Sequence, residues 1–299
     1  MVDGWKMSRR VCLAQGDVVL KQANDFRDRG VVIKGTSVSQ PEIVTPRPSA
    51  AVVLARDGTD DGDGAGAGIT VFLVRRHVRS EFAPDVFVFP GGSVAPEDRE
   101  AERSPGLCAP LADENHDERT ALGQGFRAAA LRECFEEADV LLARRGETPL
   151  SLSGDDAARF AAYRDAVTDR SSTLAAIAQQ EDLTLATDEL LHWAHWITPE
   201  MFPRRFDTHF FFAAMPPGQQ AAHDQLETTE SVWITPEEAL RRFAQGSLPL
   251  VFATEHQLRA LSSLPDIAAA RLRFGARPPE TIMPRVAQQD GQEVIVISR

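Results

Sequence analysis

The sequence predicts an α+β fold, and three observations lead to that class. Short runs of apolar residues flanked by Gly, Pro or Asp indicate β-strands. Longer segments in which Ala, Leu and Phe recur among charged residues indicate amphipathic helices, and the two kinds of segment follow one another along the chain. The chain has 299 residues, 43% of them hydrophobic, which is enough for one large globular domain with extensions.

The first part of the chain predicts an irregular arm followed by three strands. Residues 1–47 show little periodicity and contain Pro41 and Pro46, which is typical of irregular structure. The strands that we predict next are residues 50–55, 69–74 and 86–89. Between the first two, residues 57–68 consist of Gly, Asp, Ala and Thr, which indicates a long flexible hairpin loop.

The rest of the chain predicts mainly helices, with two more strands and a hairpin. Residues 130–142 form a helical pattern, whereas residues 99–125, rich in Pro, Gly and charged residues, predict a surface excursion. Residues 153–181 predict two helices. The residues expected to begin them are Asp155 or Asp156 and Ser171 or Ser172. The remaining elements that we predict are strands at 191–198 and 208–214, helices at 236–244, 254–264 and 266–274, and a β-hairpin at 285–297.

Three carboxylates share one side of the helix predicted at residues 130–142. At about 100° per residue, Glu133, Glu136 and Glu137 fall within an arc of roughly 100°, opposite an apolar arc. Like charges three and four residues apart destabilise a helix by roughly 0.2 to 0.5 kcal/mol per pair. A hard divalent cation would reverse this effect, because Mg²⁺ prefers oxygen ligands. The alternative is a solvated acidic helix without a site, since Glu is a good helix former.

A second signal lies upstream, at Phe89-Pro90-Gly91-Gly92. It predicts a turn that closes the strand at residues 86–89. Two adjacent glycines would let the backbone approach a bound anion or metal closely. The glycines and the three carboxylates are therefore candidates for one site.

Together these two motifs resemble the box of the Nudix hydrolase superfamily. That box reads Gly, five residues, Glu, seven residues, then Arg-Glu-apolar-x-Glu-Glu-x-Gly-apolar. The residues that match its second half are Arg132, Glu133, Cys134, Glu136, Glu137 and Val140, with Asp139 in place of Gly. Asp tolerates the left-handed conformation that ends such a helix, so this change is mild. In the first half Gly92 matches and Asp98 takes the Glu position, but 33 residues rather than seven separate Asp98 from Arg132.

The resemblance covers residues 48–260 and is to the coenzyme A diphosphatase branch, in which an insertion splits the box. It implies the Nudix fold, an α/β/α sandwich around a mixed β-sheet. We therefore expect an irregular arm at 1–47, a Nudix domain at 48–260, and an extension made of a helix and a β-hairpin at 261–299. Within the domain, residues 99–125 would split the box and residues 153–190 would form a helical insertion.

The resemblance also implies roles for the box residues. Glu133, Glu136 and Glu137 would hold Mg²⁺ or Mn²⁺, and Gly92 would add its backbone carbonyl. Arg132 would be structural, with its guanidinium fixing a carboxylate of the cluster. The metal would neutralise charge on phosphate oxygens, orient a diphosphate and lower the pKa of the attacking water.

The sequence specifies the general base and the phosphate-binding residues less tightly. Glu227 and Glu230 precede Trp233 in a loop region where relatives place an additional acid, and we favour Glu227. A solvated loop carboxylate is the alternative for either. The arginines expected to contact ligand phosphates are Arg75, Arg76, Arg79 and Arg205, with surface salt bridges as the alternative. His209 lies on a predicted strand, where we expect it to be packed or partnered rather than catalytic.

Charge and cysteine content exclude several classes of function. The chain has 32 basic and 44 acidic residues and a net charge of −12, which disfavours a nucleic-acid surface, including that of an RNA-decapping enzyme. The three cysteines are unevenly spaced, so neither a disulfide framework nor a zinc site is indicated, and a cytoplasmic location is expected. We expect no signal peptide, no membrane span and no nucleic-acid partner. The sequence leaves a homodimer open.

The substrate that we predict is coenzyme A or an acyl-coenzyme A, cleaved to a phosphopantetheine and 3′,5′-ADP. This prediction rests on the branch resemblance alone, because Asp85 and Glu81 stand where some coenzyme A-cleaving relatives carry Gly and Arg. ADP-ribose, NADH and a modified nucleoside triphosphate are alternatives within the same enzyme class. An alternative of another class is a Nudix-fold sensor that binds a nucleotide without hydrolysing it, which three mutually repelling acids disfavour.

Overall fold

The computed structural model describes residues 18–20, 43–58, 68–80, 83–112, 117–224, 226–289 and 292–297. Most of the predicted N-terminal arm and of the loop at 57–68 lies outside these residues. The chain divides into two compact units. The larger comprises Arg47–Trp196 and Asp207–Glu280, and the smaller comprises Ile197–Phe206 with the described residues before Arg47 and after Glu280. The domain boundaries proposed at residues 47 and 260 stay a prediction.

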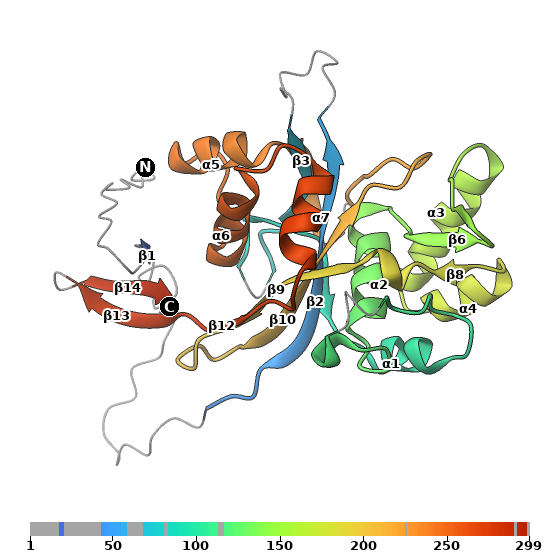
Figure 1. Cartoon of the computed structure of the whole chain (residues 1–299), viewed down its shortest axis with the longest axis horizontal. Helices are drawn as coiled ribbons and strands as arrows, with labels where there is room; N and C mark the ends of the chain where they lie inside the picture. The colour runs from blue at the N-terminus through green and yellow to red at the C-terminus, as the bar shows by residue number, and fades with distance from the viewer. Residues whose placement is uncertain are drawn as a thin grey trace. The chain divides into compact units, whose positions relative to one another are not determined.

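The larger unit is built around a β-sheet whose strands lie in the order β11-β3-β2-β10-β9 (Figure 1). The strands are β2 (Arg47–Asp57), β3 (Ile69–Arg76), β9 (Leu191–Ile197), β10 (Phe206–Ala214) and β11 (Thr228–Ile234), with β4 (Phe87–Val88) paired to β3 and β5 (Gly91–Ser93) paired to β2. In β2 the residues from Ser49 to Ala55 are buried without alternation. A continuous buried run is typical of a strand that is covered on both faces.

Helices cover both faces of this sheet, as the predicted sandwich requires. The helix α2 (Phe126–Ala138) packs against β2 and β5, while α5 (Pro236–Ala244) packs against β3 and α7 (Ile267–Gly275) against β2. Figure 1 shows α5 and α6 (Phe252–Leu261) on the side of the sheet opposite α2. The side chains of Thr235 and Asp266 accept hydrogen bonds from the first turns of α5 and α7, which is why these helices begin there.

The remaining elements of the larger unit are α1 (Pro96–Arg103), the short helix η3 (Glu118–Thr120), β6 (Ala143–Arg145), β7 (Thr148–Pro149), α3 (Asp155–Thr168), α4 (Leu174–Gln180), β8 (Thr184–Leu185) and the short helix η4 (Thr187–Glu189). Strands β7, β6 and β8 form a small separate sheet. The smaller unit contains β1 (Val18–Leu20), β12 (Thr281–Ile282), β13 (Arg285–Gln289) and β14 (Gln292–Ile297). Pairing of β13 with β14 confirms the predicted C-terminal hairpin.

Three local predictions are wrong or incomplete. The sequence predicts a turn at Gly91 and Gly92, but these residues form strand β5, because they pair with the apolar edge of β2 at Ala51 and Ala50. The residue that caps α4 is Thr173, one residue after Ser172 and two after Ser171, the two predicted capping residues, since the Thr173 side chain accepts a hydrogen bond from the first turn. The sequence places Glu230 in a loop, but it lies in strand β11. The first residues of β11 are polar, so they lack the apolar pattern that predicts a strand.

The insertion that splits the box is not a surface excursion. Ala101, Leu107 and Ala109 are buried and belong to the core. Glu102 is also buried, and its carboxylate accepts hydrogen bonds from the backbone N–H groups of Gly123, Gly125, Arg127 and Ala128 at 2.6 to 2.9 Å. These groups lie at the start of α2, where N–H donors have no partner within the helix. The insertion therefore supplies the carboxylate that caps α2.

A buried arginine makes a second connection between α2 and its surroundings. The side chain of Arg127 is fully buried. Its guanidinium donates to the carbonyls of Thr120 at 3.0 Å, Thr187 at 3.0 Å and Leu190 at 2.5 Å, and lies 5.1 Å from the centre of the Phe211 ring. Burial lowers the pKa of Arg127 to about 10. Three carbonyls from distant segments are thus satisfied by one cation on α2.

Candidate active site

The predicted acid face lies in the second half of α2. Glu133 and Glu137 are only 8% and 5% exposed, and Glu136 is half-buried. The helix ends at Asp139, whose backbone is left-handed with a φ of 56°, as expected for a residue that replaces the usual terminal Gly. Buried carboxylates need partners that satisfy their charge. We refer to Glu133, Glu136 and Glu137 as the carboxylate cluster.

Arg132 joins the two halves of the split box. Its Nε and Nη2 donate to the two carboxylate oxygens of Asp98, each at 2.9 Å. Its Nη1 donates to Glu133 at 2.7 Å and to Glu136 at 3.1 Å, and its Nη2 also donates to the Ser93 carbonyl at 2.9 Å. One guanidinium therefore partners three acids, and the long insertion does not separate the halves in space.

Strand β5 brings its glycines against the same acids. The Gly91 N–H donates to Glu137 Oε2 at 2.9 Å. A Cβ atom at position 92 would lie 2.3 Å from Glu133 Oε1 and 2.7 Å from its Oε2, so only glycine fits beside this carboxylate. The backbone of β5 and the carboxylate cluster thus belong to one site.

Burial shifts the ionisation of all three acids in the same direction. It raises the pKa of Glu133, although the neighbouring Arg132 charge opposes this. Burial and then the Glu133 charge raise the pKa of Glu137 well above its usual value, against the hydrogen bond from Gly91. The same two causes raise the pKa of Glu136 to about 7. Ionisation of the cluster near neutral pH therefore leaves negative charge that Arg132 does not fully balance.

The donor set of this site fits a hard divalent cation. Glu133 lies beside Gly92, Glu137 is bonded to Gly91, and Glu136 shares Arg132 with Glu133. Carboxylate and carbonyl oxygens are the ligands that Mg²⁺ and Mn²⁺ take in proteins. Burial and the charge of Glu133 both disfavour ionisation of Glu136 and Glu137, and a bound cation would offset these effects. The residues of the carboxylate cluster are thus matched to a cation that binds their ionised form.

The raised pKa of Glu136 predicts a pH-dependent stability of the metal-free protein. Glu136 has a pKa of about 7 when folded and an ordinary value of 4.5, so the folded state holds more protons between these values. We expect the free energy of unfolding to fall as pH rises from about 4.5 to about 7, with roughly 3 kcal/mol of this fall coming from Glu136 alone. Mg²⁺ should raise the melting temperature more at pH 8 than at pH 5.5. Thermal unfolding with EDTA or Mg²⁺ across this range measures both effects, and an equal Mg²⁺ effect at both pH values would contradict them.

Glu227 and Glu230 differ in their surroundings. Glu227 is exposed, and its charge contributes to the raised pKa values of Glu133 and Glu137. Its backbone carbonyl accepts a hydrogen bond from His77 N–H at 2.9 Å, which fixes it beside the end of β3. Glu230 instead forms an ion pair with Arg75 at 3.0 Å. Of the two acids, Glu227 is the one whose charge raises the pKa values of Glu133 and Glu137.

The four predicted phosphate-binding arginines are not equivalent. Arg76 lowers the pKa of Glu137 and so lies within electrostatic reach of the cluster. Arg75 contacts Asp85 at 2.9 Å in addition to Glu230, and the Arg79 side chain is exposed.

Arg205 has a different environment from the other three. It is buried in the smaller unit, where its guanidinium donates to the carbonyls of Thr198 at 2.9 Å and Val44 at 2.7 Å. These bonds hold loop backbone in place, so we withdraw the expectation that Arg205 binds phosphate. The sequence alone does not distinguish Arg205 from the other three arginines, because no local pattern separates an exposed arginine from a buried one that binds carbonyls.

Comparison with known proteins gives matches over most of the chain. The family model described as the NUDT19 Nudix domain matches residues 104–261. The putative nudix hydrolase 7 of Caenorhabditis elegans is 30% identical over 220 residues, which cover 74% of this chain and 62% of that protein. The acyl-coenzyme A diphosphatase NUDT19 of Homo sapiens is 26% identical over 281 residues, covering 81% of this chain and 71% of that protein. The chain thus spans less than two thirds of the C. elegans relative.

A solved structure resembles the chain closely enough to identify the fold. The crystal structure of a NUDIX hydrolase from Alicyclobacillus acidocaldarius has a TM-score of 0.63 and 27% sequence identity, and the match covers 79% of this chain and 100% of that chain. The predicted fold class is therefore confirmed. Among the described residues, no helix is both long enough and apolar enough to cross a bilayer.

Proposed function

The chain belongs to the Nudix hydrolases, and on this premise we propose that it hydrolyses the diphosphate bond of coenzyme A or an acyl-coenzyme A with Mg²⁺ or Mn²⁺ as cofactor. The products would be a phosphopantetheine and 3′,5′-ADP. The observation that carries the proposal is the carboxylate cluster, held by Arg132 against Gly92. The names of the human relative and of the matching family support the choice of coenzyme A. A small-molecule nucleotide is thus the proposed partner, while the cytoplasmic location and the homodimer stay predictions.

In this proposal Glu133, Glu136 and Glu137 hold the cation, with the Gly92 carbonyl as a further ligand. When bound, the cation would neutralise charge on the phosphate oxygens and make a nearby water more acidic. Arg132 positions two of the three acids through its bonds to Glu133 and Glu136. Because its opposite edge is fixed to Asp98, the acids are held in place before substrate arrives.

Glu227 is the proposed general base. Its carboxylate would take a proton from water while the water oxygen bonds to phosphorus and the bond from that phosphorus to the bridging oxygen breaks. Its exposure suits contact with solvent, and its contribution to the raised pKa values of Glu133 and Glu137 supports this role. Arg76, which also acts on Glu137, is the proposed contact for the negative charge of the diphosphate.

Substrate choice is tested with a panel of diphosphates. Purified protein with Mg²⁺ is incubated with coenzyme A, short- and long-chain acyl-coenzyme A, ADP-ribose, NADH and a modified nucleoside triphosphate, and the products are separated by chromatography. We expect the highest kcat/KM for coenzyme A or an acyl derivative, with release of 3′,5′-ADP. Faster turnover of ADP-ribose or NADH would contradict the proposed substrate but would support the proposed diphosphatase activity. No turnover of any compound would contradict both.

A substitution of Glu227 tests the general base. We expect Glu227→Gln to lower kcat by roughly 10² to 10⁴-fold with little change in KM, because general bases contribute on this scale. Glu230→Gln is the matched control, since it removes the same charge three residues away but from an exposed pair with Arg75. Steady-state kinetics with Mg²⁺ measures both variants. Equal losses of kcat in the two variants, or a loss in Glu230→Gln alone, would contradict the role of Glu227 as the general base.

A further inference from the structure

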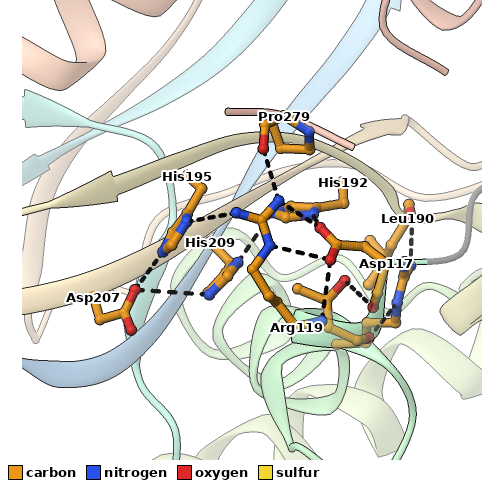
Figure 2. Close-up of polar contacts among 10 residues, drawn as sticks. Asp117, Arg119, Leu190, His192, His195, Asp207, His209 and Pro279 are labelled. Carbon is orange, nitrogen blue, oxygen red and sulfur yellow. Dashed lines mark hydrogen bonds and ion pairs between the residues drawn. The ribbon is translucent and has the colours of Figure 1, made fainter. Parts of the chain in front are cut away.

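A second group of titratable side chains lies where η3 meets β9 and β10 (Figure 2). We call it the histidine cluster, and its members are Asp117, Arg119, His192, His195, Asp207 and His209. The three histidines are 2 to 5% exposed, whereas the Asp207 side chain is 33% exposed. The proposed hydrolysis assigns no role to these residues, and all of them belong to the larger unit.

The charge of Asp117 determines where the first proton lies. Arg119 donates to both carboxylate oxygens of Asp117, from Nε at 3.1 Å and from Nη2 at 2.9 Å. A carboxylate paired in this way is ionised and only accepts hydrogen bonds. Burial alone would raise the pKa of Asp117, but the bonds from Arg119 lower it to about 2. His192 Nδ1 lies 2.7 Å from Asp117 Oδ2 and must therefore carry a proton.

The same reasoning extends from His192 to His209. A neutral imidazole carries one proton and one lone pair. Because the proton of His192 is on Nδ1, its Nε2 accepts from His209 Nδ1, which is 3.0 Å away. The lone pair of His209 is then on Nε2, 3.7 Å from Asp207 Oδ1. His209 Nε2 and Asp207 Oδ1 therefore face each other with lone pairs and no proton between them.

His195 completes a set of three donors. Its Nε2 lies 2.5 Å from Asp207 Oδ1, and its ring stacks on that of His209 with the centroids 4.0 Å apart. One nitrogen of each of these two rings and one oxygen of Asp207 all lie within 4.8 Å of one another. Ligands of a tetrahedral zinc ion are roughly 3.4 Å apart, given bonds of about 2.0 to 2.1 Å. The rings of His195 and His209 are nearly parallel, at 11°, and imidazole lone pairs lie in the ring planes. Metal binding therefore requires these rings and the partly exposed Asp207 side chain to rotate until the three donors point to one position.

We propose that His195, Asp207 and His209 bind a divalent transition-metal ion of the Zn²⁺ type. On binding, the proton of His195 moves from Nε2 to Nδ1, so the imidazole stays neutral. Arg119, whose Nη1 lies 3.2 Å from His195 Nδ1, gives up that contact but keeps its bond to the Pro279 carbonyl at 2.7 Å. Its side chain is 36% exposed, which leaves room for this small movement.

The donor atoms and their supports favour such an ion over Mg²⁺. Imidazole suits Zn²⁺, Ni²⁺, Cu²⁺ and Fe²⁺, whereas Mg²⁺ takes oxygen ligands. The other nitrogen of His209 is bonded to His192, and through it to the Asp117 carboxylate. Outer partners of this kind fix the tautomer and orientation of metal-binding histidines. Three protein ligands, one of them partly exposed, leave a coordination position that a water can reach.

Retention of metal by untagged protein tests the site. Protein is loaded with Zn²⁺ in the presence of excess Mg²⁺, separated from free metal by gel filtration and measured by elemental analysis, and Co²⁺ loading is followed by visible absorption as a probe of coordination geometry. We expect about one Zn²⁺ per chain in the wild type and in Glu137→Gln, which removes an acid of the carboxylate cluster. Asp207→Asn and His209→Gln should lose it. Asp117→Asn should weaken Zn²⁺ affinity by roughly 10 to 100-fold.

The control is His223→Gln, which removes a histidine outside the cluster and should keep full Zn²⁺ content. Retention of no Zn²⁺ by the wild type would overturn the proposal, as would equal retention by Asp207→Asn or loss in Glu137→Gln. If His209→Gln does not fold, the Zn²⁺ content of Asp207→Asn tests the site by itself. Asn has the same shape as Asp, and the Asp207 side chain is one-third exposed, so this variant is expected to fold. None of these readouts depends on hydrolysis, so failure of the diphosphatase proposal leaves the test intact.

Discussion

Glu137→Gln is expected to lower kcat by roughly 10³-fold at saturating Mg²⁺, on the scale of losing one preorganised charge-stabilising group. Glu137 is buried on α2, accepts a hydrogen bond from Gly91 N–H, and has a pKa well above its usual value. Gln keeps the shape and the hydrogen-bond acceptor but removes the charge that would bind the cation. Steady-state kinetics, with any diphosphate that the wild type hydrolyses, measures the loss.

The same variant should fold at least as well as the wild type without metal. Neutralising a buried acid removes the penalty of ionising it at pH 8, so the melting temperature in EDTA should stay equal or rise. The increase caused by Mg²⁺ should shrink or vanish. Glu147→Gln is the control, because Glu147 is exposed between β6 and β7. Turnover above about a tenth of the wild-type value, with an unchanged Mg²⁺ effect, would remove Glu137 from the metal site.

Glu102→Gln is expected to destabilise the fold by roughly 2 to 4 kcal/mol, because a buried carboxylate with four donors cannot be replaced by an amide. One oxygen of Glu102 accepts from Gly123 and Gly125, and the other from Arg127 and Ala128. In Gln, an NH₂ group would face two N–H donors on one side. The free energy of unfolding in urea, measured with the metal removed, gives the effect.

The matched control for this prediction is Glu100→Gln. Glu100 lies on the same helix, α1, two residues away, but is exposed. We expect a change of no more than about 0.5 kcal/mol for it. Equal stabilities of the two variants would mean that Glu102 does not hold the start of α2 as its hydrogen bonds indicate.

The elements that the sequence predicts well are those specified by neighbouring residues. The helix α2 and the strands β2 and β3 follow from local apolar patterns, and the end of α2 follows from Asp139. The insertion could not be predicted in this way. The backbone N–H groups that bind the Glu102 carboxylate lie 21 to 26 residues further along the chain. No local pattern records such a contact.

The candidate active site also combines residues that local spacing predicts with residues that only the folded chain brings together. The carboxylate cluster lies within one turn and a half of α2 and can be found from spacing alone. The charge of Glu227 acts on this cluster because the Glu227 backbone is fixed beside the end of β3. For the histidine cluster, the sequence predicts only that His209 lies on a strand at residues 208–214. The structure begins this strand at Phe206, which places Asp207 two residues before His209 on the same face. The partners from β9 and η3 become apparent only in the folded chain.

The capping of α2 by Glu102 means that the inserted segment has become indispensable to the chain that carries it. The first N–H groups of α2 depend on a carboxylate 23 to 26 positions upstream, inside the inserted segment. Shortening the loop to the usual seven residues would remove Glu102 together with the Thr120 carbonyl bound by Arg127. A deletion that removes Glu102 is therefore expected to destabilise the start of α2, whereas the exposed residues of the insertion can change without this effect.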